Sequence, residues 1–192
     1  MFVLFDLVFG LIKISFLGCI YATLALLTFK LIGRYKPDSW FNRIAKRKVR
    51  LWFLSGLFIS LGLFSFMFTY WGDHGLGDWA RIPIGHWKEV VQVDGTRGLI
   101  QNTNYENGNG IGLENFQLTN DFLCGKTQEH LSKYPGDYIL YNLETNEVTF
   151  FKDKKEYENF ANENQLPLVK QFNDFNYHYN RYWRGWRFWL LA

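Results

Sequence analysis

An uninterrupted apolar run is the feature that most constrains how this chain folds. Residues 51–71, LWFLSGLFISLGLFSFMFTYW, contain no charged side chain. A helix rises 1.5 Å per residue, so about 20 residues cover the roughly 30 Å of hydrocarbon in a bilayer. Trp52 and the Tyr70–Trp71 pair fall near the two ends, where amphipathic rings favour the membrane interface. The run therefore predicts a transmembrane helix, and a helix buried in a soluble core is the alternative.

The N-terminal segment is also apolar and long enough to cross a membrane, but it carries two charges. Asp6 and Lys13 share one helix face and lie about 10 Å apart along the axis. We expect these intramembrane polar residues to reach the interface, with Lys13 snorkelling outward. A polar contact with a partner helix and an ion path are the alternatives. Because the apolar run continues to Phe29, we expect an uncleaved span rather than a signal peptide.

Residues 33–50, between the two apolar segments, are strongly basic. They hold seven Lys and Arg residues against Asp38 alone. Short cationic loops stay on the cytoplasmic side, so we expect both termini of this multi-pass protein outside the cytoplasm. A short helix starting at Ser39 would bring aromatic and basic side chains to anionic headgroups. The predicted membrane and lipid contacts are Arg34, Lys36, Trp40, Phe41, Arg43, Lys46, Arg47, Lys48 and Arg50.

Small residues recur at four-residue spacing in both apolar segments. Gly18 and Ala22 form one pair, and Gly56 and Ser60 form the other. Small side chains let two helices approach closely in a membrane. The spacing predicts that the two spans pack as an antiparallel hairpin, and homo-oligomerisation through the same faces is a further possibility. Residues 1–71 are thus expected to form a two-helix membrane anchor.

Residues 72–192 have a different composition and are expected to form a small extracytoplasmic domain. They hold 12 Lys and Arg residues against 16 Asp and Glu residues. This acidic balance argues against nucleic-acid binding, which needs a basic surface. The chain has only two cysteines, one in each part, so no disulfide framework is expected.

The strand and turn patterns of this second part predict an α+β fold with a mostly antiparallel sheet. Residues 87–95 and 97–105 read as two strands joined by an Asp-Gly turn, and residues 137–153 read as a hairpin with a polar turn. Residues 106–112 are expected to form a loop. Residues 116–125 are expected to add one further strand.

Two helices are predicted after the last hairpin. Asp153 is placed to cap the first, with Glu156 three residues later and Pro167 as its stop. The second, in residues 168–192, keeps aromatic residues near helical spacing until Gly185 interrupts, and we expect it to cover one face of the sheet. A hairpin feeding a capped helix is similar to many small bacterial envelope proteins.

A glycine-rich stretch at residues 72–86 holds the weak candidates for a metal site: Asp73, His74, Asp78 and His86. These residue types bind Zn²⁺ or transfer protons, but their spacing matches no familiar ligand pattern. Four glycines and Pro83 predict a series of turns, in which Asp and His make local hydrogen bonds. We therefore expect a structural connection, with partner binding, metal binding or catalysis as alternatives.

The C-terminal segment has the most unusual composition, with arginines placed between aromatic residues. The partner-binding candidates are Arg184, Trp186, Arg187 and Trp189. Core filling and contact with the outer leaflet are alternatives, and we expect Trp183 in the core and Trp189 exposed. His130 and His178 are expected at or near the surface, and Cys124 is expected to be an inert thiol.

These patterns together predict a non-enzymatic protein of a bacterial inner membrane. Its extracytoplasmic domain would bind a protein partner in the envelope, as a complex subunit or an immunity-type protein, without a cofactor. The alternatives are a membrane-anchored metal-dependent hydrolase that uses the Asp and His residues of 72–86, and a small transport accessory protein that uses Asp6 and Lys13.

Overall fold

The computed structural model describes residues 2–72, 79–93, 98–101, 110–128 and 134–191, and it divides into two compact units. The helical unit comprises residues 1–77 and 185–192. The sheet unit comprises residues 78–184. The last eight residues therefore belong with the long helices, whereas the sequence analysis placed them in the second domain. Helices followed by an antiparallel sheet make the fold α+β, as predicted.

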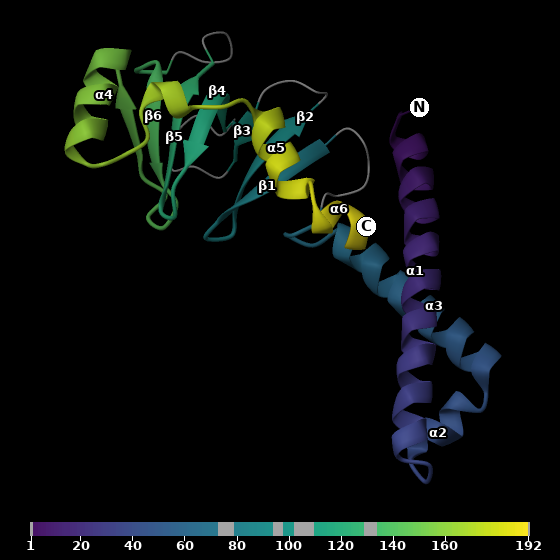
Figure 1. The fold of residues 1–192 in the computed structure, drawn as a ribbon. Coiled ribbons are helices and arrows are strands. Elements are labelled where there is room, and N and C mark those ends of the chain that lie inside the picture. Colours follow the sequence, from purple (N-terminus) through teal and green to yellow (C-terminus); the bar gives the residue numbers. More distant parts are fainter. Residues whose placement is uncertain (1, 73–78, 94–97, 102–109, 129–133, 192) are drawn as a thin grey trace. The chain divides into compact units, whose positions relative to one another are not determined.

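The described residues of the helical unit form four helices (Figure 1). They are α1 (Phe2–Tyr35), α2 (Trp40–Ala45), α3 (Lys48–Met67) and α6 (Trp186–Leu190). Both α1, over Leu7–Tyr35, and α3, over its whole length, are long and apolar enough to cross a membrane. The two helices predicted from the apolar runs are therefore present.

The small residues of α1 and α3 face one another, as predicted. A Cβ atom added at Gly18 would collide with the Ser60 hydroxyl, and one added at Gly56 would lie 3.5 Å from the Ala22 Cβ. Near the start of α1, Gly10 lies against Met67 at the end of α3. As the residue number rises along α1, the number of the contacting residue on α3 falls, so the two helices are antiparallel. Their small side chains allow close packing.

The basic segment between α1 and α3 folds around α2. The Ser39 side chain accepts a hydrogen bond from the Asn42 backbone and so caps this short helix, as expected. On the other side of the turn, the Phe29 ring contacts the rings of Trp40 and Phe41. Phe41 is half-buried, while Trp40 and the basic residues Arg34, Lys36, Arg43, Lys46, Arg47, Lys48 and Arg50 are exposed.

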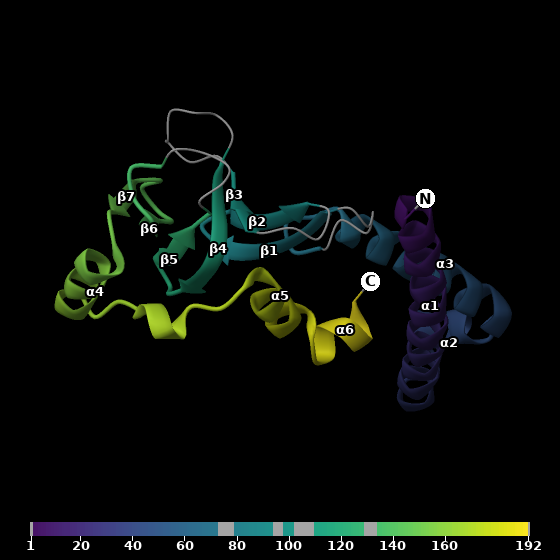
Figure 2. The same ribbon diagram turned by 90° about the horizontal axis from the view of Figure 1, so that it is seen from above.

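Seven strands form one antiparallel sheet in sequence order (Figure 2). They are β1 (Trp79–Gly85), β2 (Lys88–Val93), β3 (Gly98–Ile100), β4 (Ile111–Leu118), β5 (Phe122–Thr127), β6 (Tyr138–Asn142) and β7 (Val148–Phe151). After them come α4 (Lys154–Glu163), a 3₁₀ turn (Val169–Gln171) and α5 (Phe175–Trp183). Each strand pairs with its neighbour in sequence.

The sheet has an apolar core on each face. Along β6, Ile139 and Tyr141 point into the larger core, whereas Tyr138 and Leu140 point into the smaller one. Phe175 brings α5 into the larger core, and α5 contacts β1 and β4. Tyr157 and Ala161 of α4 close the smaller core, and α4 contacts β6 and β7. Figure 1 shows α4 at the β6 end of the sheet.

Three local predictions of the sequence are confirmed in this unit. The strands β2 and β3 pair antiparallel, while the Asp-Gly turn predicted between them lies outside the described residues, and β6 and β7 pair as a hairpin. The Asp153 side chain accepts from the Glu156 backbone, and the Glu156 carboxylate accepts from the Lys152 backbone, which together satisfy two free N–H groups at the start of α4.

One turn prediction and one strand prediction were wrong. Residues 79–85 form the edge strand β1 rather than turns, because pairing with β2 satisfies their backbone and an edge strand tolerates Pro83. Residues 116–125 belong to two strands instead of one, because Thr119 and Phe122 exchange hydrogen bonds that close a tight turn between β4 and β5. The end of the predicted loop 106–112 also joins β4.

The predicted C-terminal helix is broken into three pieces. The Asp174 side chain caps a fresh helix, α5, by accepting from the Tyr177 backbone. At Gly185 the backbone has a φ of 74°, which ends the continuity and separates α5 from α6. Phe172 consequently packs on the smaller core and Phe175 on the larger one, so the aromatic stripe is split between two faces.

Candidate interaction surface

Of the four predicted metal-site residues, only His86 lies in the described part of the chain. Asp73, His74 and Asp78 fall outside the described residues. His86 follows β1 and is exposed. The structure therefore defines the environment of one of these four side chains.

His86 and Trp87 form the two-residue turn between β1 and β2. Gly85 pairs with Lys88 across the hairpin, and the φ angles of His86 and Trp87 are 48° and 59°. A turn with two central residues at positive φ suits the twist of a hairpin, but it normally uses Asn and Gly. Large side chains in this backbone region cost of order 1 kcal/mol or more, and they concentrate at functional sites.

The turn between β6 and β7 makes a useful contrast. There Asn146 takes the left-handed conformation, with a φ of 65°, and Asn is a residue that tolerates it. The Asn142 side chain accepts hydrogen bonds from the backbones of Glu144 and Thr145, which fixes the loop locally. The β6–β7 turn thus has a residue that tolerates the left-handed conformation. The β1–β2 turn instead has Trp87 in that conformation, and 74% of this residue is exposed.

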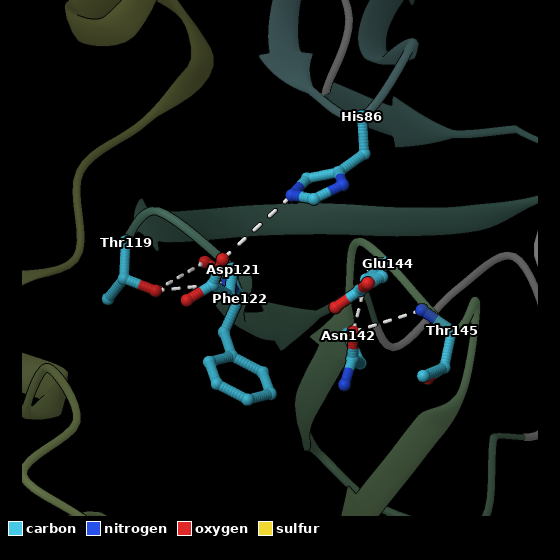
Figure 3. A network of polar contacts seen from close by, with 7 residues as sticks. All are labelled: His86, Thr119, Asp121, Phe122, Asn142, Glu144 and Thr145. Atoms are coloured by element: carbon cyan, nitrogen blue, oxygen red, sulfur yellow. Dashed lines mark hydrogen bonds and ion pairs between the residues drawn. The ribbon is translucent and has the colours of Figure 1, made fainter.

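Figure 3 shows the imidazole of His86 directed toward Asp121 in the turn between β4 and β5. His86 Nε2 lies 3.9 Å from Asp121 Oδ1, and both side chains are substantially exposed. Beside Asp121, the Thr119 hydroxyl accepts from the Phe122 backbone at 3.0 Å and holds that turn closed. The pair is a solvent-accessible polar contact between two turns, of the kind that contributes little to stability.

Within the described residues, no group of three or more His, Cys, Asp or Glu side chains could hold a metal ion. Zinc sites in proteins use three or four such ligands. His86 and Asp121 alone supply two. The described part of this surface presents an aromatic ring, an imidazole and a carboxylate to solvent. We define the turn surface as His86, Trp87 and Asp121.

Cys124 lacks the solvent exposure and the lowered pKa that a nucleophilic thiol needs. It is fully buried in the smaller core beside Tyr157. Burial raises the pKa of the Cys124 thiol to about 11, and the hydrogen bond with Tyr157 lowers it less than burial raises it. The thiol stays protonated near neutral pH, in agreement with an inert role.

His178 is buried rather than at the surface. Its Nε2 donates to the Phe116 carbonyl oxygen at 2.8 Å, and its ring stacks on the Phe116 ring with 4.3 Å between centroids. Burial lowers the pKa of His178 below its ordinary value, and the nearby Arg181 lowers it further, although the carbonyl contact and Asp174 act in the opposite direction. His130 lies outside the described residues.

This lowered pKa predicts a pH-dependent stability. As the pH falls below about 6.5, His178 gains a proton in the unfolded chain first, so the free energy of unfolding decreases, by up to about 1.4 kcal/mol per pH unit. Above that pH both states are neutral and the residue contributes no pH dependence. Urea unfolding of the detergent-solubilised protein between pH 7.5 and 5.5 measures the slope. Replacing His178→Gln should remove this part of the slope, and His86→Gln should leave it in place.

The C-terminal candidates divide between the two units. Arg184 is the last residue of the sheet unit, while Trp186, Arg187 and Trp189 lie on α6 in the helical unit. Trp189 is 71% exposed, as expected. Trp183 is half-buried, with its Nε1 atom 3.5 Å from the Arg81 carbonyl oxygen, and it belongs to neither core, whereas the sequence predicted it in the core.

The two charges predicted inside the first span both lie on α1. Lys13 is half-buried, and its Nζ atom lies 4.9 Å from the centroid of the Phe188 ring on α6. The side chain of Asp6 is outside what the structure describes. Lys13 thus contacts an aromatic ring of a second helix in the same chain, and its expected position at the membrane interface stays a prediction.

Sequence reasoning missed Trp87 and Asp121. The signal for Trp87 was the short segment at residues 85–88 between two stretches of alternating apolar residues. Such a pattern indicates a hairpin even without an Asn-Gly pair. No local signal identifies Asp121, because its neighbour His86 comes from a turn 35 positions earlier in the sequence. No protein-family model, curated protein or solved structure matches the chain.

Proposed function

We propose that this chain is a membrane-anchored binding module that presents its sheet unit outside the cytoplasm of a bacterial cell and engages a protein partner there. Anchoring is supported by the apolar side chains that α1 and α3 expose over their length, including Phe9, Phe16, Phe53 and Phe58, each at least 63% exposed. Contiguous apolar surface of this extent is unfavourable in water and is satisfied by lipid.

The orientation is supported by the exposed basic residues around α2. Seven Lys and Arg side chains lie in residues 33–50, between the two apolar helices. A short basic connection of this kind stays on the cytoplasmic side. The chain segments on the other ends of α1 and α3, and with them the sheet unit, then lie outside the cytoplasm.

Partner binding is carried by one observation, the exposed Trp87 in a backbone conformation that costs free energy. A turn selected for stability alone would use Asn or Gly at this position. Exposed tryptophan is the side chain most enriched among residues that dominate protein–protein binding. The turn surface, with His86 and Asp121 beside Trp87, is therefore the proposed contact, either within an envelope complex or with a protein that this chain neutralises.

The test measures separately how Trp87 affects the stability of the protein and how it affects partner binding. We expect Trp87→Asn to leave the free energy of unfolding unchanged or to raise it by up to about 1 kcal/mol, because Asn tolerates the left-handed region. The melting temperature should accordingly stay the same or rise. The same substitution should abolish co-purification of a stoichiometric partner in mild detergent. A photo-reactive amino acid at position 87 should crosslink to that partner in intact cells, and protease added outside spheroplasts should digest the product.

A matched control is available on α4, where Lys155 is exposed and remote in sequence from the turn surface. A photo-reactive residue at position 155 should give no crosslink to the same partner. A protein that loses stability with Trp87→Asn and keeps its partner would contradict the proposal. Purified protein that carries bound zinc and hydrolytic activity would favour the metal-dependent hydrolase instead.

A further inference from the structure

The C-terminal helix α6 lies against α1 through two specific contacts. The Tyr21 hydroxyl donates to the Leu190 carbonyl oxygen at 2.7 Å. Toward the start of α1, the Lys13 ammonium lies over the Phe188 ring at 4.9 Å. Tyr21 also packs against the apolar cluster between α1 and α3, so the donor is held in place by the helix pair.

These contacts fix the level of α6 along the span. The apolar window of α1 begins at Leu7, and Lys13 lies six residues further on, roughly 9 Å along the axis. Tyr21 lies 14 residues beyond Leu7, roughly 21 Å along the axis, and its side chain leans back toward the N-terminus of the helix. With the basic loop in the cytoplasm, the Lys13 contact lies in the outer half of the hydrocarbon, and the Tyr21 contact lies near its middle.

The side chains of α6 suit this level. Trp186, Phe188 and Trp189 are 61%, 55% and 71% exposed, and the Arg187 guanidinium lies over the Trp186 ring at 5.5 Å. Large aromatic rings with a neighbouring arginine are typical of segments that lie among headgroups and upper acyl chains. These exposed rings lie on a helix that contacts α1, whose own apolar side chains Phe9 and Phe16 are exposed as well.

The Tyr21 contact also satisfies a backbone carbonyl group at the end of α6. The last carbonyl groups of any helix lack partners within it, and in hydrocarbon no water replaces them. The Tyr21 hydroxyl supplies a donor to the carbonyl of Leu190 at the end of α6. Lys13, which reaches from the span toward the interface, gains the electron-rich face of the Phe188 ring.

We propose that α6 is a lipid-contacting element of the outer leaflet, in which Trp186, Phe188 and Trp189 touch phospholipid and Tyr21 holds the end of the helix on α1. The occupant of this surface is the phospholipid bilayer itself. The inference rests on the membrane anchoring of the proposed function and is independent of the protein partner.

The experiment places a nitrobenzoxadiazole fluorophore at single cysteines of the full chain in vesicles of phosphatidylethanolamine and phosphatidylglycerol. The background carries Cys19→Ser, and the buried Cys124 is left in place. Labels are attached through Trp189→Cys on α6, Phe58→Cys on the exposed face of α3, and Asn176→Cys on the exposed side of α5. Nitroxide-bearing phospholipid reports contact with lipid, and iodide reports contact with water.

At position 189 we expect blue-shifted emission, strong quenching by the nitroxide lipid and several-fold weaker quenching by iodide than at position 176. Position 58 should behave like 189. Adding Tyr21→Phe should increase iodide quenching at position 189, because the end of α6 loses its donor.

Each other outcome overturns the inference in a recognisable way. Equal iodide quenching at 189 and 176 would place α6 in water. Protection from both quenchers would indicate that protein covers α6. Loss of nitroxide quenching at both 58 and 189 would refute the anchoring as well, and so would separate failure of the membrane assignment from failure of the α6 assignment. An unchanged signal with Tyr21→Phe would remove the role of the Tyr21 hydroxyl.

Discussion

Phe175→Ala is expected to destabilise the sheet unit by about 3–5 kcal/mol, because the substitution removes a large buried ring and leaves a cavity. Phe175 is 3% exposed and belongs to the larger core together with Ile82 of β1 and Phe116 of β4. A small domain has a total stability of about 5–15 kcal/mol, so the loss is a large share. Urea unfolding of the full chain in detergent, followed by near-ultraviolet circular dichroism, measures the effect.

Tyr177→Ala is the matched control, since Tyr177 is also an aromatic residue of α5 but is 46% exposed. Its effect should stay at about 1 kcal/mol or less. Trp183→Ala is expected to fall between the two, because the indole is half-buried at the end of α5. Equal midpoints for Phe175→Ala and the unsubstituted protein would show that α5 does not close this core.

Gly18→Leu is expected to separate α1 from α3. A side chain at this position would collide with Ser60, and the Gly56 carbonyl oxygen is only 3.4 Å from the position of the new Cβ. Inserting a larger side chain into a packed interface typically costs about 1–3 kcal/mol. The matched control is Gly62→Leu on α3, because no atom lies within 4 Å of a Cβ added at Gly62.

A designed disulfide reports the separation directly. The Cβ of Ala22 and a Cβ built at Gly56 are 3.5 Å apart, within the range that a disulfide spans. In a Cys19→Ser background, the pair Ala22→Cys and Gly56→Cys should therefore form a disulfide on mild oxidation. Adding Gly18→Leu should slow this reaction by about tenfold or more, which corresponds to about 1.4 kcal/mol, and adding Gly62→Leu should not. Equal rates in all three proteins would contradict the close packing.

Local signals in the sequence were sufficient wherever a few neighbouring residues decide the structure. The long apolar runs predicted α1 and α3, and Asp153 with Glu156 predicted the start of α4. Small residues at positions 18 and 56 predicted the contact between the long helices, because close approach depends on side-chain size alone.

Prediction failed where the deciding interactions come from distant parts of the chain. Residues 79–85 carry glycine and proline signals of a turn, but pairing with β2 makes them a strand. The turn surface was missed because His86 and Asp121 lie in turns that are distant in the sequence and meet only in the folded sheet. The aromatic spacing before Gly185 suggested one helix, since periodicity does not reveal that Phe172 and Phe175 enter different cores.

The order of strands in the sheet has a consequence for how the protein is made. Each strand pairs with the one that precedes it, so every hairpin closes a short loop and can form while synthesis continues. The larger core, in contrast, needs Phe175 from near the end of the chain beside Ile82 of the first strand. Until those late residues have been synthesised, the growing sheet leaves that apolar face uncovered, and this interval is when a nascent chain is most open to aggregation or to a chaperone.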